Sequence, residues 1–380
     1  MSKPIGIYIH VPFCQSKCPY CDFYSLTGQS ASIFDDYTEA VIRSLALWSG
    51  RLSGARADTL YFGGGTPTLL GGERLAEIIK AAGRHFGLEG AEITIEANPG
   101  DSLEPVFSAF AQAGGNRVSI GAQSFNQEQL RVLGRRHNPA DVRAAIEAAL
   151  SAGIRNISVD IMLCVPTPEP ETPDRQIELA VQSASDAAKL RVKHISAYML
   201  KIEKNTPFSD RKGELFLPSE DTAAEIYLAA CLELERQGYR QYEISNFAAP
   251  GDICRHNPKH WNLEPYLGIG PAAHSYLDGR RFYYTANLDA FISGCAPVPE
   301  GDRITKKITE QEYIMLKLRL AEGVTNQGFL ERFSHPIPKK YYRRASLIPS
   351  EYLTADSKGI RLNRRGFLLS NTIIARLLDD

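Results

Sequence analysis

The amino-acid sequence predicts an α/β protein built on an open six-stranded parallel barrel. Six short apolar segments alternate with longer segments that carry apolar residues at helical spacing, and a repeated β-α unit indicates a parallel sheet. No glycine-rich phosphate fingerprint follows the first strand, which favours a barrel over a doubly wound sheet. Polar residues recur on one face of the strands, whereas a closed eight-stranded barrel fills its interior with apolar side chains.

The predicted strands occupy residues 5–11, 59–63, 92–97, 117–124, 156–163 and 194–200. The helices predicted between and after them occupy residues 35–52, 72–86, 103–113, 139–152, 174–190 and 219–237. From about Ile304 the pattern changes to helices at 309–319 and 328–333. Residues 359–378 then predict a short strand pair and a helix, with a turn at 364–366. We therefore expect a small helical, winged-helix-like domain at the carboxyl end.

Three regions follow from this pattern: a barrel over 1–237, an extension over 238–303 and the last domain over 304–380. A chain of 380 residues exceeds one average domain.

The formal charge of the chain is −1, which offers no electrostatic basis for binding nucleic acid or an anionic membrane surface. The first strand begins almost at Met1 and no apolar run reaches membrane-spanning length, so we expect a cytoplasmic protein without a targeting peptide.

Alternation along the strands separates two sides of the predicted sheet, because residues two apart project to the same face. The side expected to pack under helices carries Ile7, Ile9, Ile93, Ile95, Val118, Ile120, Ile157, Val159, Ile161, Ile195 and Ala197. The opposite side carries Tyr8, His10, Thr94, Glu96, Asn98, Ser119, Gly121, Gln123, Ser158, Asp160, His194, Ser196 and Tyr198. A polar lumen is costly unless ligand or water occupies it. Exposure to ordinary solvent is the weaker alternative, since parallel sheets are usually covered on both faces.

The most informative motif is the Cys-x3-Cys-x2-Cys spacing of Cys14, Cys18 and Cys21. Three soft thiolates can hold three irons of a 4Fe-4S cluster, which leaves the fourth iron without a protein ligand. A disulfide framework does not fit, because three cysteines leave one unpaired and the other four are scattered. A structural zinc site is the rival interpretation, with His10 as its fourth ligand.

Residues 8–23, with an apolar strand before the cysteines and an aromatic residue between the second and third, resemble radical S-adenosylmethionine (radical SAM) enzymes. The resemblance covers nearly the whole chain, including residues 242–248 and 266–275. It is greatest to the family of oxygen-independent coproporphyrinogen III oxidases and, within it, to the HemW branch of haem chaperones. It implies that the open iron chelates the amino and carboxylate groups of S-adenosylmethionine, whose reductive cleavage yields a 5′-deoxyadenosyl radical.

The same resemblance implies a set of S-adenosylmethionine-binding residues, most of them in the predicted lumen. The set is Tyr8, Tyr20, Gly64, Gly65, Thr66, Glu96, Gln123, Arg135 and Asp160. Its chemistry is suitable, because a carboxylate and an amide can bind ribose hydroxyls and Arg135 offers a planar fork to a carboxylate. Taken singly, the glycines at 63–65 predict a turn and Arg135 a surface charge.

A second motif spans residues 254–261 and contains His256, His260 and Trp261. HemW-like proteins have His-Asn-x-x-Tyr-Trp here, associated with haem, and this chain has His260 in place of the tyrosine. Imidazole is a good axial haem ligand, so His256 is the implied ligand, ahead of His260 and Cys254. The alternative is a capped helix start with Trp261 packed in the core.

Two functions are compatible with these motifs. The first is a haem chaperone that passes haem to acceptor proteins; the second is a radical enzyme that acts on a porphyrin. Phe23 stands where the oxidases of the family carry a further cysteine, and only thirteen residues precede Cys14, so the resemblance favours the chaperone. The resemblance also implies an electron donor such as flavodoxin or ferredoxin. It is compatible with a homodimer, and it allows membrane association only through acceptor proteins.

Overall fold

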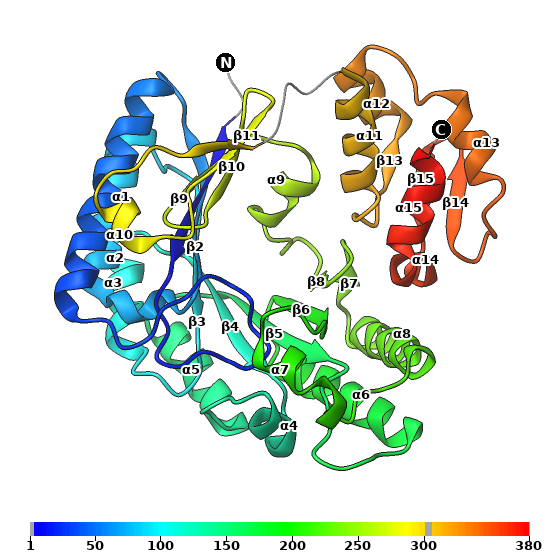
Figure 1. Cartoon of the computed structure of the whole chain (residues 1–380), viewed down its shortest axis with the longest axis horizontal. Helices are drawn as coiled ribbons and strands as arrows, with labels where there is room; N and C mark the ends of the chain where they lie inside the picture. Colours follow the sequence, from blue (N-terminus) through cyan, green and yellow to red (C-terminus); the bar gives the residue numbers. More distant parts are fainter. Residues whose placement is uncertain (1–3, 301–305, 380) are drawn as a thin grey trace.

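The computed structural model describes residues 4–300 and 306–379. Six parallel strands form the centre of one curved sheet in sequence order, and helices cover its outer face (Figure 1). The strands are β1 (Ile5–Val11), β2 (Ala57–Gly64), β3 (Glu92–Ala97), β4 (Arg117–Gln123), β5 (Asn156–Leu163) and β6 (His194–Met199). The predicted six-stranded parallel (β/α) architecture is therefore confirmed.

The connecting helices also follow the predicted order. They are α1 (Ala31–Arg51), α2 (Gly72–Phe86), α3 (Glu104–Gln112), α5 (Pro139–Ser151), α6 (Pro173–Lys189) and α8 (Glu220–Arg236). Helix α5 illustrates why the boundaries agree. The Asn138 side chain accepts from the first-turn amides, the Asp141 carboxylate accepts from the Asn138 amide, and Pro139 occupies the first turn. The short helices α4 (Gln127–Val132) and α7 (Pro207–Asp210) were not predicted.

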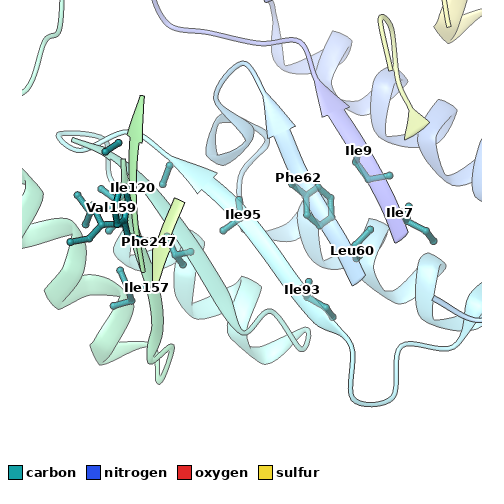
Figure 2. Close-up of a cluster of buried hydrophobic side chains, with 14 of the residues drawn as sticks. Ile7, Ile9, Leu60, Phe62, Ile93, Ile95, Ile120, Ile157, Val159 and Phe247 are labelled. Carbon is teal, nitrogen blue, oxygen red and sulfur yellow. The ribbon is translucent and has the colours of Figure 1, made fainter. Parts of the chain in front are cut away.

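The apolar side of the strands packs under these helices as expected. Figure 2 shows side chains from the strands gathered in this layer, including Ile7, Ile9, Phe62, Ile95 and Val159, and all five are fully buried. Burying one such side chain contributes about 1.5–3 kcal/mol. The alternating positions on the same strands therefore face the lumen, where Thr94 and Ser158 are also buried.

Short strands extend the sheet at both edges. Beside β1 lie β9 (Tyr266–Ile269), which is parallel to it, and then β10 (His274–Leu277), β11 (Arg280–Tyr283) and β12 (Val298–Glu300). Beside β6 lie β8 (Asn246–Ala248) and β7 (Arg240–Gln241). The helices α9 (Asn257–Trp261) and α10 (Leu288–Ile292) complete this region. The domain boundary predicted after residue 237 thus falls within one sheet and stays a prediction, and the boundary at 303–304 lies outside the described residues.

The carboxyl-terminal part pairs helices with a small antiparallel sheet of order β13-β15-β14. Its elements are α11 (Lys306–Lys317), β13 (Val324–Thr325), α12 (Asn326–Phe333), α13 (Lys339–Ala345), β14 (Leu353–Asp356), β15 (Gly359–Leu362), α14 (Arg364–Leu368) and α15 (Ser370–Leu378). Two predictions were wrong here. The strand pair begins at Leu353, before residue 359, and the predicted turn at 364–366 is the start of α14, capped by the Asn363 side chain.

This part is attached at a defined place to the segment that follows the barrel. The Ile244 amide donates to the Arg319 carbonyl at 2.9 Å, and the Ala321 amide donates to the Tyr242 carbonyl at 3.0 Å. On the other side, Lys317 Nζ donates to Asn262 Oδ1 at 3.0 Å, just after α9. Across the described residues, no helix combines the length and apolar character needed to cross a membrane.

Candidate cluster and cofactor site

A cavity of about 360 Å³ opens at the carboxyl ends of the barrel strands. Ligand sites of parallel barrels lie at this end, because the loops after the strands converge there. The lining contains Cys14, Cys18, Cys21, Tyr20, Gly64, Gly65, Thr66, Glu96, Gln123, Arg135 and Asp160. The structure therefore brings together every residue predicted for the cluster and S-adenosylmethionine except Tyr8. Their roles as ligands stay predictions.

The three cysteines lie on the loop that follows β1. This loop is tied to the barrel by hydrogen bonds from the Cys14 amide to the Leu26 carbonyl, 2.9 Å, and from the Leu26 amide to the Pro12 carbonyl, 2.7 Å. All three thiols are free and partly exposed, and burial raises the pKa of Cys21. Among the described residues, no three His, Cys, Asp or Glu side chains converge to hold one metal ion. Thiolates that bind separate irons of a cluster need not converge in that way.

The ring of His10 is engaged by other groups, which weakens the zinc alternative. Nε2 lies 2.9 Å from the Tyr24 carbonyl and Nδ1 lies 3.1 Å from the Tyr8 hydroxyl. A carbonyl only accepts, so Nε2 carries the proton and Nδ1 accepts from Tyr8. Neither nitrogen is left for a metal. The same bond explains why Tyr8 does not line the cavity, because its hydroxyl is directed to His10.

The glycines at the end of β2 permit close packing under the cysteine loop. The Gly65 amide donates to the Val11 carbonyl at 2.8 Å, and a Cβ on Gly65 would lie 2.5 Å from the Phe13 carbonyl oxygen. Gly64 has a φ of +108°, and its Cβ would lie 2.6 Å from the His10 ring. A side chain at either position would displace the strand that leads to the cysteines. Beyond them, the Thr66 hydroxyl donates to Cys14 Sγ at 3.7 Å.

Arg135 reaches from the segment after α4 into the cavity. Its Nη2 donates to Asn98 Oδ1 at 2.7 Å and to the Gly121 carbonyl at 2.8 Å, and its Nη1 lies 3.7 Å from Cys18 Sγ. Its Nε is buried and has no hydrogen-bond partner among the described residues. An unpaired buried donor is costly, so this donor set fits a further acceptor such as a ligand carboxylate.

Two buried carboxyl groups face the same cavity. Glu96 accepts from the Tyr61 hydroxyl at 2.8 Å and from the Gly64 amide at 3.2 Å. Burial raises the pKa of Glu96 to about 7, although both bonds favour the carboxylate. Asp160 accepts from the Ser119 hydroxyl at 3.1 Å, and burial raises its pKa as well. Both groups keep lone pairs that can accept ligand hydroxyls.

Gln123 stands at an irregular point of β4. The register with β5 shifts between Gly121 and Gln123, and Gln123 has a φ of 63°. A residue with a side chain seldom adopts this left-handed conformation, which costs roughly 1 kcal/mol or more. Such strain is concentrated at functional positions, and here it accompanies a side chain that lines the cavity.

Other lining residues were not singled out as ligands from the sequence. Asn98, Ser119 and Tyr198 were assigned to the lumen by strand alternation alone, and Met162 was not assigned. At the same cavity Phe23 is 59% exposed and Tyr198 is 40% exposed. Tyr61, which binds Glu96, was also missed, although the alternation of Thr59, Tyr61 and Gly63 would have placed it inward.

The second motif lies at the opposite end of the barrel from the cysteines. The His256 ring is buried against the start of β2, where Nδ1 lies 2.8 Å from Thr59 Oγ1. Its Nε2 is buried without a hydrogen-bond partner among the described residues, and burial lowers its pKa well below the usual value. The buried Cys254 thiol donates to Glu92 Oε1 at 3.5 Å. The structure thus separates the candidate haem ligand from the cofactor cavity.

Helix α9 begins directly after His256, with Pro258 in its first turn. The helix start was therefore predicted correctly, although no side chain caps it. His260 packs its ring on Tyr266 at 4.1 Å between centroids, and burial lowers its pKa to about 4. Trp261 is partly buried and its indole donates to the Glu243 carboxyl.

Residues 8–180 match the family model described as the Radical SAM superfamily. Over its full length the chain is 33% identical to a curated protein named heme chaperone HemW from Lactococcus lactis, covering 99% of that protein. It is 35% identical to heme chaperone HemW of Escherichia coli, over 86% of this chain and 85% of that one. Among solved structures it is similar to coproporphyrinogen III oxidase (HemN) of Escherichia coli, with a TM-score of 0.84, 21% identity, and coverage of 100% of this chain and 91% of that chain.

The structural similarity at 21% identity supports the fold alone. The sequence similarity goes further, because more than 30% identity is maintained from end to end. The cavity at the cysteine end of the barrel lies where the matched Radical SAM region contributes its strands. The chain belongs to the HemW family, within the radical SAM superfamily.

Proposed function

We propose that this protein is a haem chaperone that binds haem and transfers it to acceptor proteins. It carries a 4Fe-4S cluster held by Cys14, Cys18 and Cys21, together with S-adenosylmethionine. The observation that supports the cofactor part is the cavity of about 360 Å³ that joins the three thiols to all the predicted S-adenosylmethionine residues except Tyr8. The haem part rests on the end-to-end similarity to curated proteins named heme chaperone HemW.

In this proposal different cavity residues bind different parts of S-adenosylmethionine. Arg135 holds the carboxylate through its unpaired Nε, and Gly64 and Gly65 line the same cavity. Glu96 and Asp160 accept ribose hydroxyls, while Tyr20 covers the adenosyl group. When bound, the cluster and S-adenosylmethionine supply one-electron chemistry at the sulfonium.

For haem we propose His256 as the axial ligand. The Thr59 hydroxyl bonded to Nδ1 orients the ring and leaves Nε2 for iron. The side chain is 2% exposed, so a ligand as large as haem can reach it only if the surrounding segments move. His260 is the second choice, because its ring is less buried and follows on the same short helix.

A radical enzyme acting on a porphyrin is the second candidate. One observation favours it: Phe23, Met162 and Tyr198 give the cofactor cavity an apolar lining, and two of these side chains are well exposed. A flat apolar molecule can stack on such a surface. Phe23 also argues against this candidate. The oxidases that the chain resembles have a further cysteine at this position, and phenylalanine has no thiol to replace it.

Electron supply, assembly and location belong to the same proposal. The loop residues Gln15, Ser16 and Lys17 are exposed beside the thiols, which suits electron transfer from a small donor protein such as flavodoxin or ferredoxin. A homodimer and a cytoplasmic location are proposed with it, and contact with membranes is expected only through acceptor proteins. Size-exclusion chromatography with light scattering, with and without haem, measures the assembly state.

One anaerobic experiment separates the two functions. The cluster-reconstituted full chain is incubated with reductant, S-adenosylmethionine and coproporphyrinogen III, and haem binding is titrated in parallel by absorbance. The chaperone predicts stoichiometric haem binding and no accumulation of protoporphyrinogen. Repeated turnover of coproporphyrinogen would favour the enzyme, and a chain that binds no haem is not a haem chaperone.

A further inference from the structure

The side chain of Tyr61 contacts both candidate sites at once. It projects into the lumen, because its neighbours Leu60 and Phe62 on β2 lie in the apolar layer (Figure 2). Its hydroxyl donates to Glu96 Oε1 at 2.8 Å in the cofactor cavity. Its ring stacks on His256 with 5.0 Å between centroids and 27° between planes. One rigid phenol therefore contacts a residue of each candidate site.

The Glu96 end of this contact is tightly enclosed. The second carboxyl oxygen of Glu96 accepts from the Gly64 amide at 3.2 Å. A Cβ on Gly63 would lie 3.0 Å from Tyr61 Cε1 and 3.0 Å from Glu96 Oε1. The bare backbone at Gly63 is what allows the phenol and the carboxyl group to meet.

The His256 end is equally constrained. Nδ1 is bonded to Thr59 at 2.8 Å, and the Tyr8 ring lies 6.4 Å from the imidazole and 6.1 Å from Tyr61. Because packed interiors have few alternative arrangements, a small shift at one member is passed to its neighbours. The ring of His256 can therefore respond to the position of the Tyr61 phenol.

We propose that Tyr61 is a positioning residue that couples the cofactor cavity to His256. A ligand hydroxyl that donates to Glu96 Oε1 shares that oxygen with the Tyr61 hydroxyl and weakens their bond, and the resulting shift of the phenol changes the orientation of the His256 ring. This rests on the proposed function for the identity of the two ligands. Binding free energies are reciprocal, so haem at His256 changes the affinity for S-adenosylmethionine by the same factor.

The matched variants are Tyr61→Phe and Tyr239→Phe. The first removes the hydroxyl from Glu96 and keeps the ring against His256. The second removes an equally buried hydroxyl, which donates to the Val192 carbonyl at 2.6 Å and has no contact with either site. Both are prepared as the full chain with the cluster reconstituted, and histidine ring nitrogens are labelled with ¹⁵N for NMR.

Saturating S-adenosylmethionine is expected to shift the His256 ring signals in the parent chain and in Tyr239→Phe, and to leave them unmoved in Tyr61→Phe. The signals are assigned by their loss in His256→Gln. An unmoved His256 signal in the parent chain with the ligand bound overturns the coupling. An equal shift in Tyr61→Phe overturns it too.

The haem arm of the experiment measures the ratio of haem dissociation constants without and with S-adenosylmethionine. Coupling of the usual strength gives a ratio of about 5 or more in either direction, and Tyr61→Phe is expected to bring it close to one. General damage to the fold changes both constants and leaves their ratio alone. If the NMR shifts follow the expectation while no haem binds, the coupling stands and the proposed haem function fails.

Discussion

The guanidinium group of Arg135 lies against the thiol of Cys18, with Nη1 3.7 Å from Sγ. The same side chain is held by the Asn98 amide oxygen and the Gly121 carbonyl. A residue proposed to bind the cofactor carboxylate is thus in contact with a residue proposed to bind the cluster. This contact makes Arg135 the position where the two parts of the site can be separated experimentally.

Replacing Arg135 by lysine keeps the positive charge and removes the planar fork. We expect the affinity for S-adenosylmethionine to fall about tenfold or more, because a hydrogen bond to a charged group contributes roughly 1.5–3 kcal/mol. Equilibrium dialysis of the labelled cofactor measures the change. The neighbouring Arg136→Lys is the control, since its side chain is half-exposed. Equal affinities in both variants would remove Arg135 from the cofactor site.

Replacing Cys14, Cys18 or Cys21 singly by alanine is expected to abolish the cluster. Each thiolate is the sole protein ligand of one iron in the proposal, so no cavity residue can substitute for it. Cys295→Ala is the control, because Cys295 is a partly exposed free thiol that does not line the cavity. Iron and sulfide analysis after anaerobic reconstitution measures the outcome. A parent chain that binds zinc and no iron contradicts the cluster assignment.

Replacing His256 by alanine tests the haem ligand. Haem affinity, followed by absorbance, is expected to fall at least tenfold, whereas His85→Ala on the outer helix α2 is expected to leave it unchanged. The Thr59 hydroxyl loses its partner in His256→Ala, so the melting temperature is recorded for both variants. A folded His256→Ala chain with unchanged haem affinity would show that His256 is not the ligand.

The strands of the barrel were predictable because each alternates between a covered apolar side and a polar lumen. The bounds of β1, β3 and β5 agree with the prediction at both ends. The edge strands β9 to β12 were not predicted, because they have only three or four residues each and cannot display a period. Helix α13 was missed for another reason: its Lys and Arg side chains resemble a solvated surface segment, and Pro338 stands directly before it.

For the site, the motif resemblance predicted most of the residues that line the cavity, and the alternation pattern predicted which strand residues face the lumen. Neither could show which lumen residues touch each other. The bond between Tyr61 and Glu96 and the separation of His256 from the cysteines depend on register between strands and on the path of the chain after β8. Tyr8 is a further contact that the sequence could not show, since its hydroxyl binds His10 and does not line the cavity.

Glu243 predicts a pH dependence of stability. The carboxyl group is 1% exposed, and burial raises its pKa to about 7, against hydrogen bonds from Ser245, Asn246 and Trp261 that favour the carboxylate. In the unfolded chain the pKa is about 4.5. The folded state therefore holds more protons between these values, and the free energy of unfolding falls as pH rises from about 4.5 to 7. The contribution is on the order of 3 kcal/mol.

Glu243→Gln removes this titration and keeps an oxygen acceptor. We expect the free energy of unfolding, measured with urea at pH 5 and pH 8, to decrease less with pH in Glu243→Gln than in the parent chain. The pKa of Glu96 is also raised, but Glu96 is present in both proteins, so its contribution to the pH dependence cancels in the comparison. Glu39→Gln, at an exposed position on α1, is expected to match the parent chain. Equal pH slopes for the parent chain and Glu243→Gln would mean that Glu243 is already ionised in the folded protein, with its charge compensated by the Ser245, Asn246 and Trp261 donors.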